Sequence, residues 1–256
     1  MLKIILCSIL DYLPMYRIHV ALIVVLLGAS LDVSAGVIAD NTRIIYNIDK
    51  KEQSFQVVNI NDYPVLVQLW VDDGGVDSSP EKASNSPVIP LPAIFKLKSK
   101  EAKSIRLVKI DDNIAADRET LYWLTIYEVP PTPEKGDNAD NAADDNKAVL
   151  ILTTRTQMKL LLRPAALFNQ VETMPTNVSF KWVDKSLVLM NNSPFYVTIA
   201  SLRLSDKDDK TQYSGMLEPF SEIAVAWEPD SQPESLVMTY IDDYGSQNDV
   251  VISKAK

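Results

Sequence analysis

Short segments rich in β-branched and aromatic residues follow one another along most of the chain after residue 35. Pro, Asn, Asp and Ser separate them at intervals of roughly 8–15 residues, which is typical of β-sandwiches rather than of βαβ units. The pattern predicts strands over 36–46, 54–60, 64–71, 94–97, 104–109, 120–129, 149–162, 178–182, 186–190, 196–204, 223–227, 236–241 and 250–252. We therefore expect an all-β protein of two immunoglobulin-like β-sandwich domains joined near Arg163-Pro164.

The predicted strand over 149–162 begins with a run of four apolar residues, Val149 to Leu152. A strand with one buried face alternates apolar and polar residues, so a continuous run indicates two covered faces. The run nevertheless follows segment 137–146, whose Asp, Asn and Ala residues cannot bury enough surface to order it. Apolar side chains on both faces of a strand beside solvent need a partner, and the pattern suggests a protein that lends a strand to another polypeptide.

The first predicted strand contains a cation, Arg43. An arginine inside an apolar strand must reach water or an anion, because burying it alone costs several kcal/mol. Two interpretations are open for this residue: an exposed strand face and an anion site.

Residues 1–35 have the features of a secretory signal. Tyr16-Arg17 precede an apolar run over 20–27, and Val33-Ser34-Ala35 gives a small-x-small end. A membrane anchor is the alternative, but the run is short for a bilayer span. We expect a cleavable signal peptide over 1–35, with Met1 or Met15 as its start, and no membrane insertion after cleavage.

Composition excludes several kinds of chemistry from the rest of the chain. The single cysteine, Cys7, and the single histidine, His19, both lie in residues 1–35. Without them there is no disulfide, thiol nucleophile, zinc site of the usual N/S type, Ser–His–Asp triad or histidine-ligated haem. About 220 remaining residues suffice for two domains of about 100.

The net charge and the composition of the loops argue against several classes of ligand. The formal net charge of −9 argues against nucleic acid and anionic membranes as partners, and residues 1–35 contribute two cations and two anions to it. No glycine-rich GK[ST] loop exists to bind a nucleotide. Segment 137–146 lacks the mid-loop glycine and terminal glutamate of an EF-hand. We expect no metal and no other cofactor.

Five blocks stand out in order along the chain: 40–46 (Asp-x-Thr-Arg-x-x-Tyr), 117–123 with Glu128-Val129-Pro130-Pro131, 159–166, 192–198 and 240–245. They resemble the periplasmic pilus chaperones of the chaperone–usher pathway, and the resemblance covers nearly all of 36–256. It implies a non-enzymatic periplasmic protein with two immunoglobulin-like domains in an L-shaped arrangement, over 36–162 and 163–256.

The resemblance further implies that the protein binds, folds and caps fimbrial subunits and delivers them to an outer-membrane usher. Each subunit would receive the strand missing from its own sandwich, by donor-strand complementation. Leu150, Leu152 and Thr154 would be the inserted side chains. Val149 and Ile151, at the opposite parity, would face the protein's own core.

Two charged groups have roles by the same resemblance. Arg43 and Lys159 would hold the subunit's C-terminal carboxylate. Glu119, Arg163 and Asp243 would form a buried network near the domain junction, the alternative being three ordinary surface charges.

Two other classes of protein are weighed against the chaperone. A structural pilus subunit or adhesin would be a single sandwich, usually with a disulfide. An enzyme, such as a Ser–Lys or carboxylate-pair hydrolase, would need a pair of catalytic groups, and no spacing marks one. The long segment between Pro131 and Val149, without the cysteine pair of the long-loop branch, leaves the type of fibre open.

Overall fold

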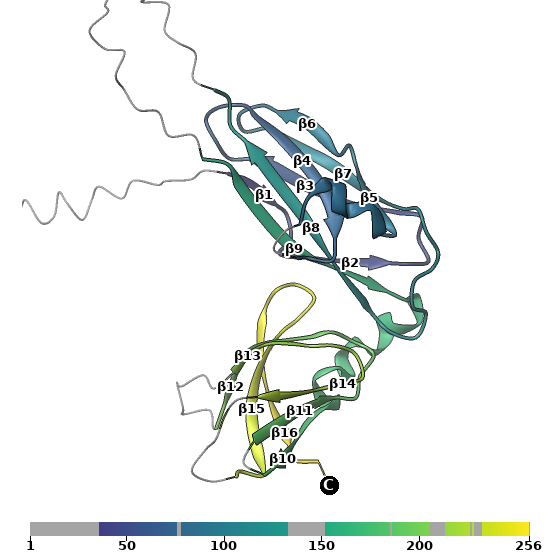
Figure 1. Ribbon diagram of the computed structural model, residues 1–256, viewed down its shortest axis with the longest axis vertical. Helices are drawn as coiled ribbons and strands as arrows, with labels where there is room; N and C mark the ends of the chain where they lie inside the picture. The colour runs from purple at the N-terminus through teal and green to yellow at the C-terminus, as the bar shows by residue number, and fades with distance from the viewer. Residues whose placement is uncertain are drawn as a thin grey trace, which may run out of the picture. The chain divides into compact units, whose positions relative to one another are not determined.

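The computed structural model describes residues 36–75, 78–132, 152–184, 186–204, 213–225, 227 and 232–255 (Figure 1). The described chain is almost entirely β-structure in four sheets, two to each sandwich. The prediction of an all-β protein with two β-sandwich domains is confirmed.

The first sandwich pairs a four-stranded sheet with a five-stranded one. The four-stranded sheet has the order β1 (Val37–Ala39), β3 (Glu52–Asn59), β7 (Ala102–Lys109), β5 (Val88–Leu91). The five-stranded sheet has the order β2 (Arg43–Asn47), β9 (Thr154–Arg163), β8 (Thr120–Val129), β4 (Val65–Asp72), β6 (Ile94–Leu97). Every pairing is antiparallel except that of β2 with β9, which is parallel.

Alternation of side chains builds the core of this sandwich. In β3, Phe55 and Val57 are buried while Gln56 between them is exposed. In β9, Met158, Leu160 and Leu162 belong to the same core. This period of two is what a strand with one buried face requires.

The second sandwich has a three-stranded and a four-stranded sheet. The first has the order β10 (Val178–Val183), β11 (Ser186–Asn191), β14 (Ser221–Val225). The second has the order β13 (Tyr213–Leu217), β12 (Val197–Arg203), β15 (Ser235–Ile241), β16 (Gln247–Ser253). Its core includes Phe180, Leu189 and Ile199.

Short 3-10 helices occur where no helix is predicted. They are η1 (Pro80–Asn85), η2 (Ala165–Thr173) and η3 (Pro175–Asn177). The last two connect β9 to β10, and Leu167 of η2 is buried against the second core. A 3-10 helix has three residues per turn, so it does not give the 3.6-residue apolar repeat that predicts an α-helix.

The strand predictions agree best where the apolar pattern is strongest. Those over 94–97 and 120–129 match β6 and β8 to the residue. The single strand predicted over 36–46 is instead two strands, β1 and β2, which lie in different sheets. β5 was not predicted because it contains Pro90; β5 is an edge strand, the position in a sheet where proline is tolerated.

Within the part of the chain that the structure describes, no helix is long and apolar enough to cross a membrane.

Candidate anion site beside an open strand edge

β9 is covered on both sides over only half of its length. On one side β8 pairs with it from Thr154 to Leu162. On the other side β2 pairs only with Lys159 to Arg163. Among the described residues, no strand pairs with the second edge of segment 154–158. An unpaired edge presents backbone N–H and C=O groups to any strand that can lie along it.

Two cations stand where this open edge ends. Arg43 and Lys159 are register partners in the parallel pair of β2 and β9, so their side chains leave the sheet next to each other. The Arg43 Nη1 atom donates to the Ile241 carbonyl at 3.3 Å, and its buried Nε atom has no partner. Lys159 Nζ donates to Thr198 Oγ1 at 2.8 Å and lies 6.0 Å from the centre of the Trp123 ring.

Neither cation is neutralised by a carboxylate of the described residues within salt-bridge distance. Burial lowers the pKa of Arg43, an effect opposed by the charges of Asp243, Asp242 and Glu119. Burial, and then the charge of Arg43, lower the pKa of Lys159 to about 8. Two adjacent, half-buried positive charges that no described carboxylate pairs with favour the binding of an anion, and a carboxylate matches the guanidinium in both charge and geometry.

Arg163, the last residue of β9, is in contrast fully paired. Its Nε atom donates to Glu119 Oε1 at 2.6 Å, and its two Nη atoms donate to the carboxylate of Asp243 at 2.6 and 2.7 Å. The side chains of Arg163 and Glu119 are only 2% and 1% exposed. Glu119 Oε2 also accepts the Tyr196 backbone N–H at 2.7 Å. These bonds connect β9 and the residue before β8 in the first sandwich with the β15–β16 turn and the residue before β12 in the second.

The protonation of this group follows from burial and pairing. Burial raises the pKa of Glu119, although Arg163 and the Tyr196 N–H favour its charged form. Burial would lower the pKa of Arg163, but its bonds to Asp243 and Glu119 outweigh burial and raise the pKa. The rings of Phe168 and Phe195, each 5.3 Å from the guanidinium carbon, enclose the arginine.

Backbone geometry brings the β15–β16 turn close to β2. Gly245 has a φ of +88°, and a Cβ atom there would collide with Thr42 Oγ1. Only glycine fits this close approach without strain. Next to it, a cavity of about 250 Å³ is lined by Arg43, Arg163 and Asp243 among others. Arg43 of the predicted anchor therefore lines the same hollow as Arg163 and Asp243 of the predicted network.

The predicted donor residues are partly described. Leu150, Val149 and Ile151 lie outside the described residues. Leu152 is 67% exposed, and Thr154 is exposed as the first residue of β9.

The sequence predicts that the donor side chains and the core-facing side chains of this strand alternate and so point to opposite faces of the sheet. The register of β9 differs from this prediction. The core-facing residues of β9 are Met158, Leu160 and Leu162, and the pairing with β8 has no bulge. Thr154 thus has the parity of the core-facing residues. The physical reason is that β9 extends beyond its own core, since burial ends at Met158 and the next residues on that face, Thr156 and Thr154, are exposed.

Several residues of the site are not predicted from the sequence. Trp123 lies within a block that resembles the family, and yet nothing there marks it as a neighbour of Lys159. Thr198 and the Ile241 carbonyl come from the second sandwich, and no local pattern predicts a contact made across two domains. In the described part of the chain, no group of three or more His, Cys, Asp or Glu side chains could hold a metal ion.

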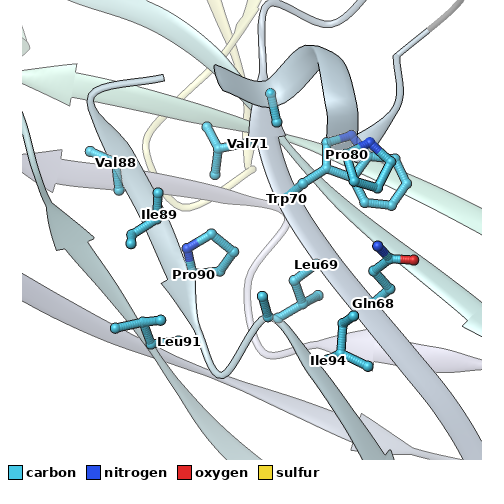
Figure 2. A pocket seen from close by; sticks show the side chains of 12 residues that line it. Gln68, Leu69, Trp70, Val71, Pro80, Val88, Ile89, Pro90, Leu91 and Ile94 are labelled. Atoms are coloured by element: carbon cyan, nitrogen blue, oxygen red, sulfur yellow. The ribbon is translucent and has the colours of Figure 1, made fainter. Parts of the chain in front are cut away.

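A second hollow, of about 350 Å³, lies between β4, β5, β6 and η1 (Figure 2). Its lining includes Leu69, Pro90 and Ile94 and contains no charged side chain. This groove is suited to apolar contact and does not share the chemistry of the anion site.

Comparison with known proteins covers both sandwiches. Residues 36–168 match the family model described as pili and flagellar-assembly chaperone, PapD N-terminal domain. Residues 173–251 match that of the pili assembly chaperone PapD, C-terminal domain.

Individual relatives agree with the family models. The chaperone protein MyfB of Yersinia enterocolitica is 32% identical over 222 residues, covering 82% of this chain and 80% of its own length. The Pseudomonas aeruginosa CupB2 chaperone is 27% identical with a TM-score of 0.69, covering 85% of this chain and 100% of that one. The Salmonella enterica SafA pilin in complex with the SafB chaperone gives 26% identity and a TM-score of 0.70, with 86% and 97% covered.

Replacing Arg163 by alanine is expected to destabilise the fold by about 3–5 kcal/mol, because it leaves Glu119 buried without its cation. The matched control is Arg106→Ala, whose side chain is 56% exposed and pairs with Glu52 at the surface, and which should cost about 0–1 kcal/mol. Arg118 is a poorer control because it lies 5.1 Å over the ring of Phe220. Urea unfolding of both variants measures the difference, and equal losses would show that the Arg163 network contributes no more than a surface pair.

Replacing Lys159 by methionine is expected to leave the protein at least as stable at pH 7 as the parent. The lysine pKa is lowered to about 8 in the folded chain, whereas an unfolded lysine has a pKa of about 10.4. The unfolded chain therefore binds more protons between these values, and the penalty of holding the charged lysine disappears as pH rises from about 8 to about 10.4. The advantage of Lys159→Met in melting temperature should shrink over that range. Lys96→Met, at an exposed position of β6, is the control and should show no such trend. The same trend in this variant would show that the lowered pKa of Lys159 is not its cause.

Proposed function

Because the chain belongs to the PapD family of pilus-assembly chaperones, which are not enzymes, we propose that it captures fimbrial subunits by donating a strand to them. One observation carries this proposal: the open edge of β9 ends at two cations that no carboxylate of the described residues neutralises. A strand that ends in a carboxylate satisfies both features together. The solved complex of the SafB chaperone with the SafA pilin supports a pilin subunit as the partner.

The direction of the captured strand follows from the register. β2 occupies the edge of β9 from Lys159 onward. A subunit strand along 154–158 with its C-terminus at Lys159 therefore runs parallel to β9 and continues the line of β2. Ladder hydrogen bonds would supply affinity, and alternate side chains would supply specificity.

The proposed anchor divides the work between two cations. The guanidinium of Arg43 grips both carboxylate oxygens in parallel, while the ammonium of Lys159 adds a compact point charge. Burial and the charge of Arg43 disfavour the charged form of Lys159. A bound carboxylate would supply a counter-charge and stabilise that form. The anchor thereby fixes the register of the captured strand.

Leu150, Leu152 and Thr154 are the proposed donor side chains. Thr154 shares its parity with Met158 and Leu160, which face the core of the first sandwich. A subunit that covers this face would make its own core continuous with that of the chaperone. Full burial of each leucine would contribute roughly 1.5–3 kcal/mol.

The Glu119–Arg163–Asp243 network is proposed to hold the anchor in shape. Asp243 belongs to the turn that follows Ile241, and the Ile241 carbonyl accepts the bond from Arg43. Fixing the turn through Arg163 thus fixes the carbonyl that orients Arg43. By this account the first domain, 36–162, brings the donor strand and the second, 163–256, supports its end.

Location and delivery complete the proposal. Removal of the predicted signal peptide over 1–35 would release the protein into the periplasm, where pilus chaperones act. There it would pass each subunit to an outer-membrane usher.

Arg43→Ala and Lys159→Ala should each remain folded and lose subunit capture by about 2–5 kcal/mol, because each leaves the subunit carboxylate with one cation fewer in a desolvated site. The test is co-purification of a fimbrial subunit co-expressed in the periplasm, with melting temperature as the check on folding. Lys96→Ala removes an exposed lysine elsewhere and should capture normally. Normal capture by either anchor variant would disprove the carboxylate anchor.

Leu152→Glu should abolish subunit capture and leave the melting temperature nearly unchanged, because Leu152 is exposed in the free protein. Leu160 is fully buried in the same sandwich, so Leu160→Ala should instead cost about 2–5 kcal/mol of folding stability. Measuring melting and capture for the two variants separates donation from folding. A folded Leu152→Glu variant that captures subunits as well as the parent would remove Leu152 from the donor strand.

A further inference from the structure

Glu128, near the end of β8, is a buried carboxylate that no described cation pairs with. It is 5% exposed. Its Oε1 atom accepts a hydrogen bond from Asn61 Nδ2 at 2.8 Å, and its Oε2 atom accepts from the Val37 backbone N–H at 2.8 Å and from Thr154 Oγ1 at 3.2 Å. Three neutral donors satisfy its oxygens, but a buried charge also calls for a counter-charge.

The backbone nitrogen of Gly36 lies in the same group. It donates to Asn61 Oδ1 at 2.8 Å, and Asn61 is held in turn by Asn59. A Cβ atom at position 36 would meet Glu128 Oε2 at 3.7 Å. The next nitrogen along the chain, that of Val37, is already bonded to that carboxylate.

We propose that Glu128 is the built-in acceptor for the α-ammonium group that cleavage after Ala35 creates on Gly36. The inference rests on the predicted cleavage site, and it is independent of subunit capture. The match to the N-terminal family model also begins at residue 36.

The covalent step is hydrolysis of the Ala35–Gly36 peptide bond by a signal peptidase. One water molecule is consumed: its hydroxyl adds to the Ala35 carbonyl carbon as the C–N bond breaks, and its remaining hydrogen goes to the Gly36 nitrogen, which leaves as an amine. An α-amino group has a pKa of about 7.7–8.0, so the amine takes up a proton at neutral pH. A neutral amide with one N–H becomes a cation with three.

The new positive charge arises beside Glu128, the carboxylate that no described cation pairs with. One N–H can keep the bond to Asn61 Oδ1, and the others can turn toward Glu128. Lys100 also bonds to the segment next to Asn61, since its Nζ atom donates to the Ile60 carbonyl. It is paired with Asp62 at 3.0 Å. It therefore does not serve Glu128.

The consequence reaches the open strand. Glu128 also holds Thr154, the first residue of β9. An ammonium that fixes the carboxylate fixes the start of the donor segment as well. Removal of the signal peptide would thus complete the fold at the end of the strand that the chaperone donates.

The test needs no subunit. The periplasmic protein should first give a mass that begins at Gly36; any other start overturns the proposal. Two chains are then compared, one released from a fusion so that it begins at Gly36 and one that begins at Ser34, each with Glu128 and with Glu128→Gln. The chain that begins at Ser34 should melt about 3 °C or more below the other when Glu128 is present. In the Glu128→Gln background this difference should vanish.

The same loss with glutamine as with glutamate would overturn the proposal, because the extension would then act without the carboxylate. Glu222→Gln, at an exposed position of the second sandwich, is the matched control and should leave the difference intact. If Glu128→Gln does not fold, acetylation of the Gly36 amine in the parent chain gives the answer. Acetylation should lower the melting temperature, and an unchanged melting temperature would refute the ion pair.

Discussion

The parallel pairing of β2 with β9 is the constraint on which the rest of the structure depends. It is only five residues long, so it leaves half of the β9 edge open and places Arg43 opposite Lys159 where the open part ends. Like charges in register on neighbouring strands are destabilising, and burial, which with the charge of Arg43 lowers the pKa of Lys159 to about 8, adds to the penalty. A fold selected for stability alone would place a carboxylate here. The proposed function explains the missing carboxylate, because the partner brings it.

Positive charge has opposite surroundings at two places along β9, at its last residue and at Lys159, which lies opposite Arg43. Arg163 is almost wholly buried and makes three charged hydrogen bonds to Glu119 and Asp243, whereas Arg43 retains a buried Nε atom without a partner. Removing one member of a buried pair costs several kcal/mol, so the Arg163 network resists rearrangement. Arg43, in contrast, is stabilised when an anion binds to it. The rigid Arg163 network lies next to the anion-binding pair Arg43 and Lys159. Because this support keeps the pair ordered before binding, little free energy is lost in ordering the site, and affinity is higher.

The sequence predicts the fold well because the cores are made by alternation, which is a local property. Phe55 and Val57 in β3 are recognisable from their spacing alone. Prediction fails where the controlling fact is tertiary. Pro90 hides β5, since its tolerance depends on the edge position that the strand takes in the sheet. The parity of Thr154 is not predicted because nothing local reveals that the core ends at Met158. Glu128 stands within a block that resembles the family, but its burial depends on contacts with Val37 and Asn61, which lie 91 and 67 positions away.

The open edge must also reject the wrong strands, since exposed edges invite aggregation. Its outer residues are Thr154, Arg155 and Thr156, all exposed, so the edge offers little apolar surface of its own. Any strand that pairs with it reaches Arg43 and Lys159 and meets the end of β2, which occupies the edge beyond. An internal segment of a polypeptide would have to turn away there and would leave two cations further desolvated without a counter-charge. A C-terminal strand ends at that point and supplies the carboxylate. The same two cations that weaken the free protein would therefore select the chain end of a subunit over any other strand.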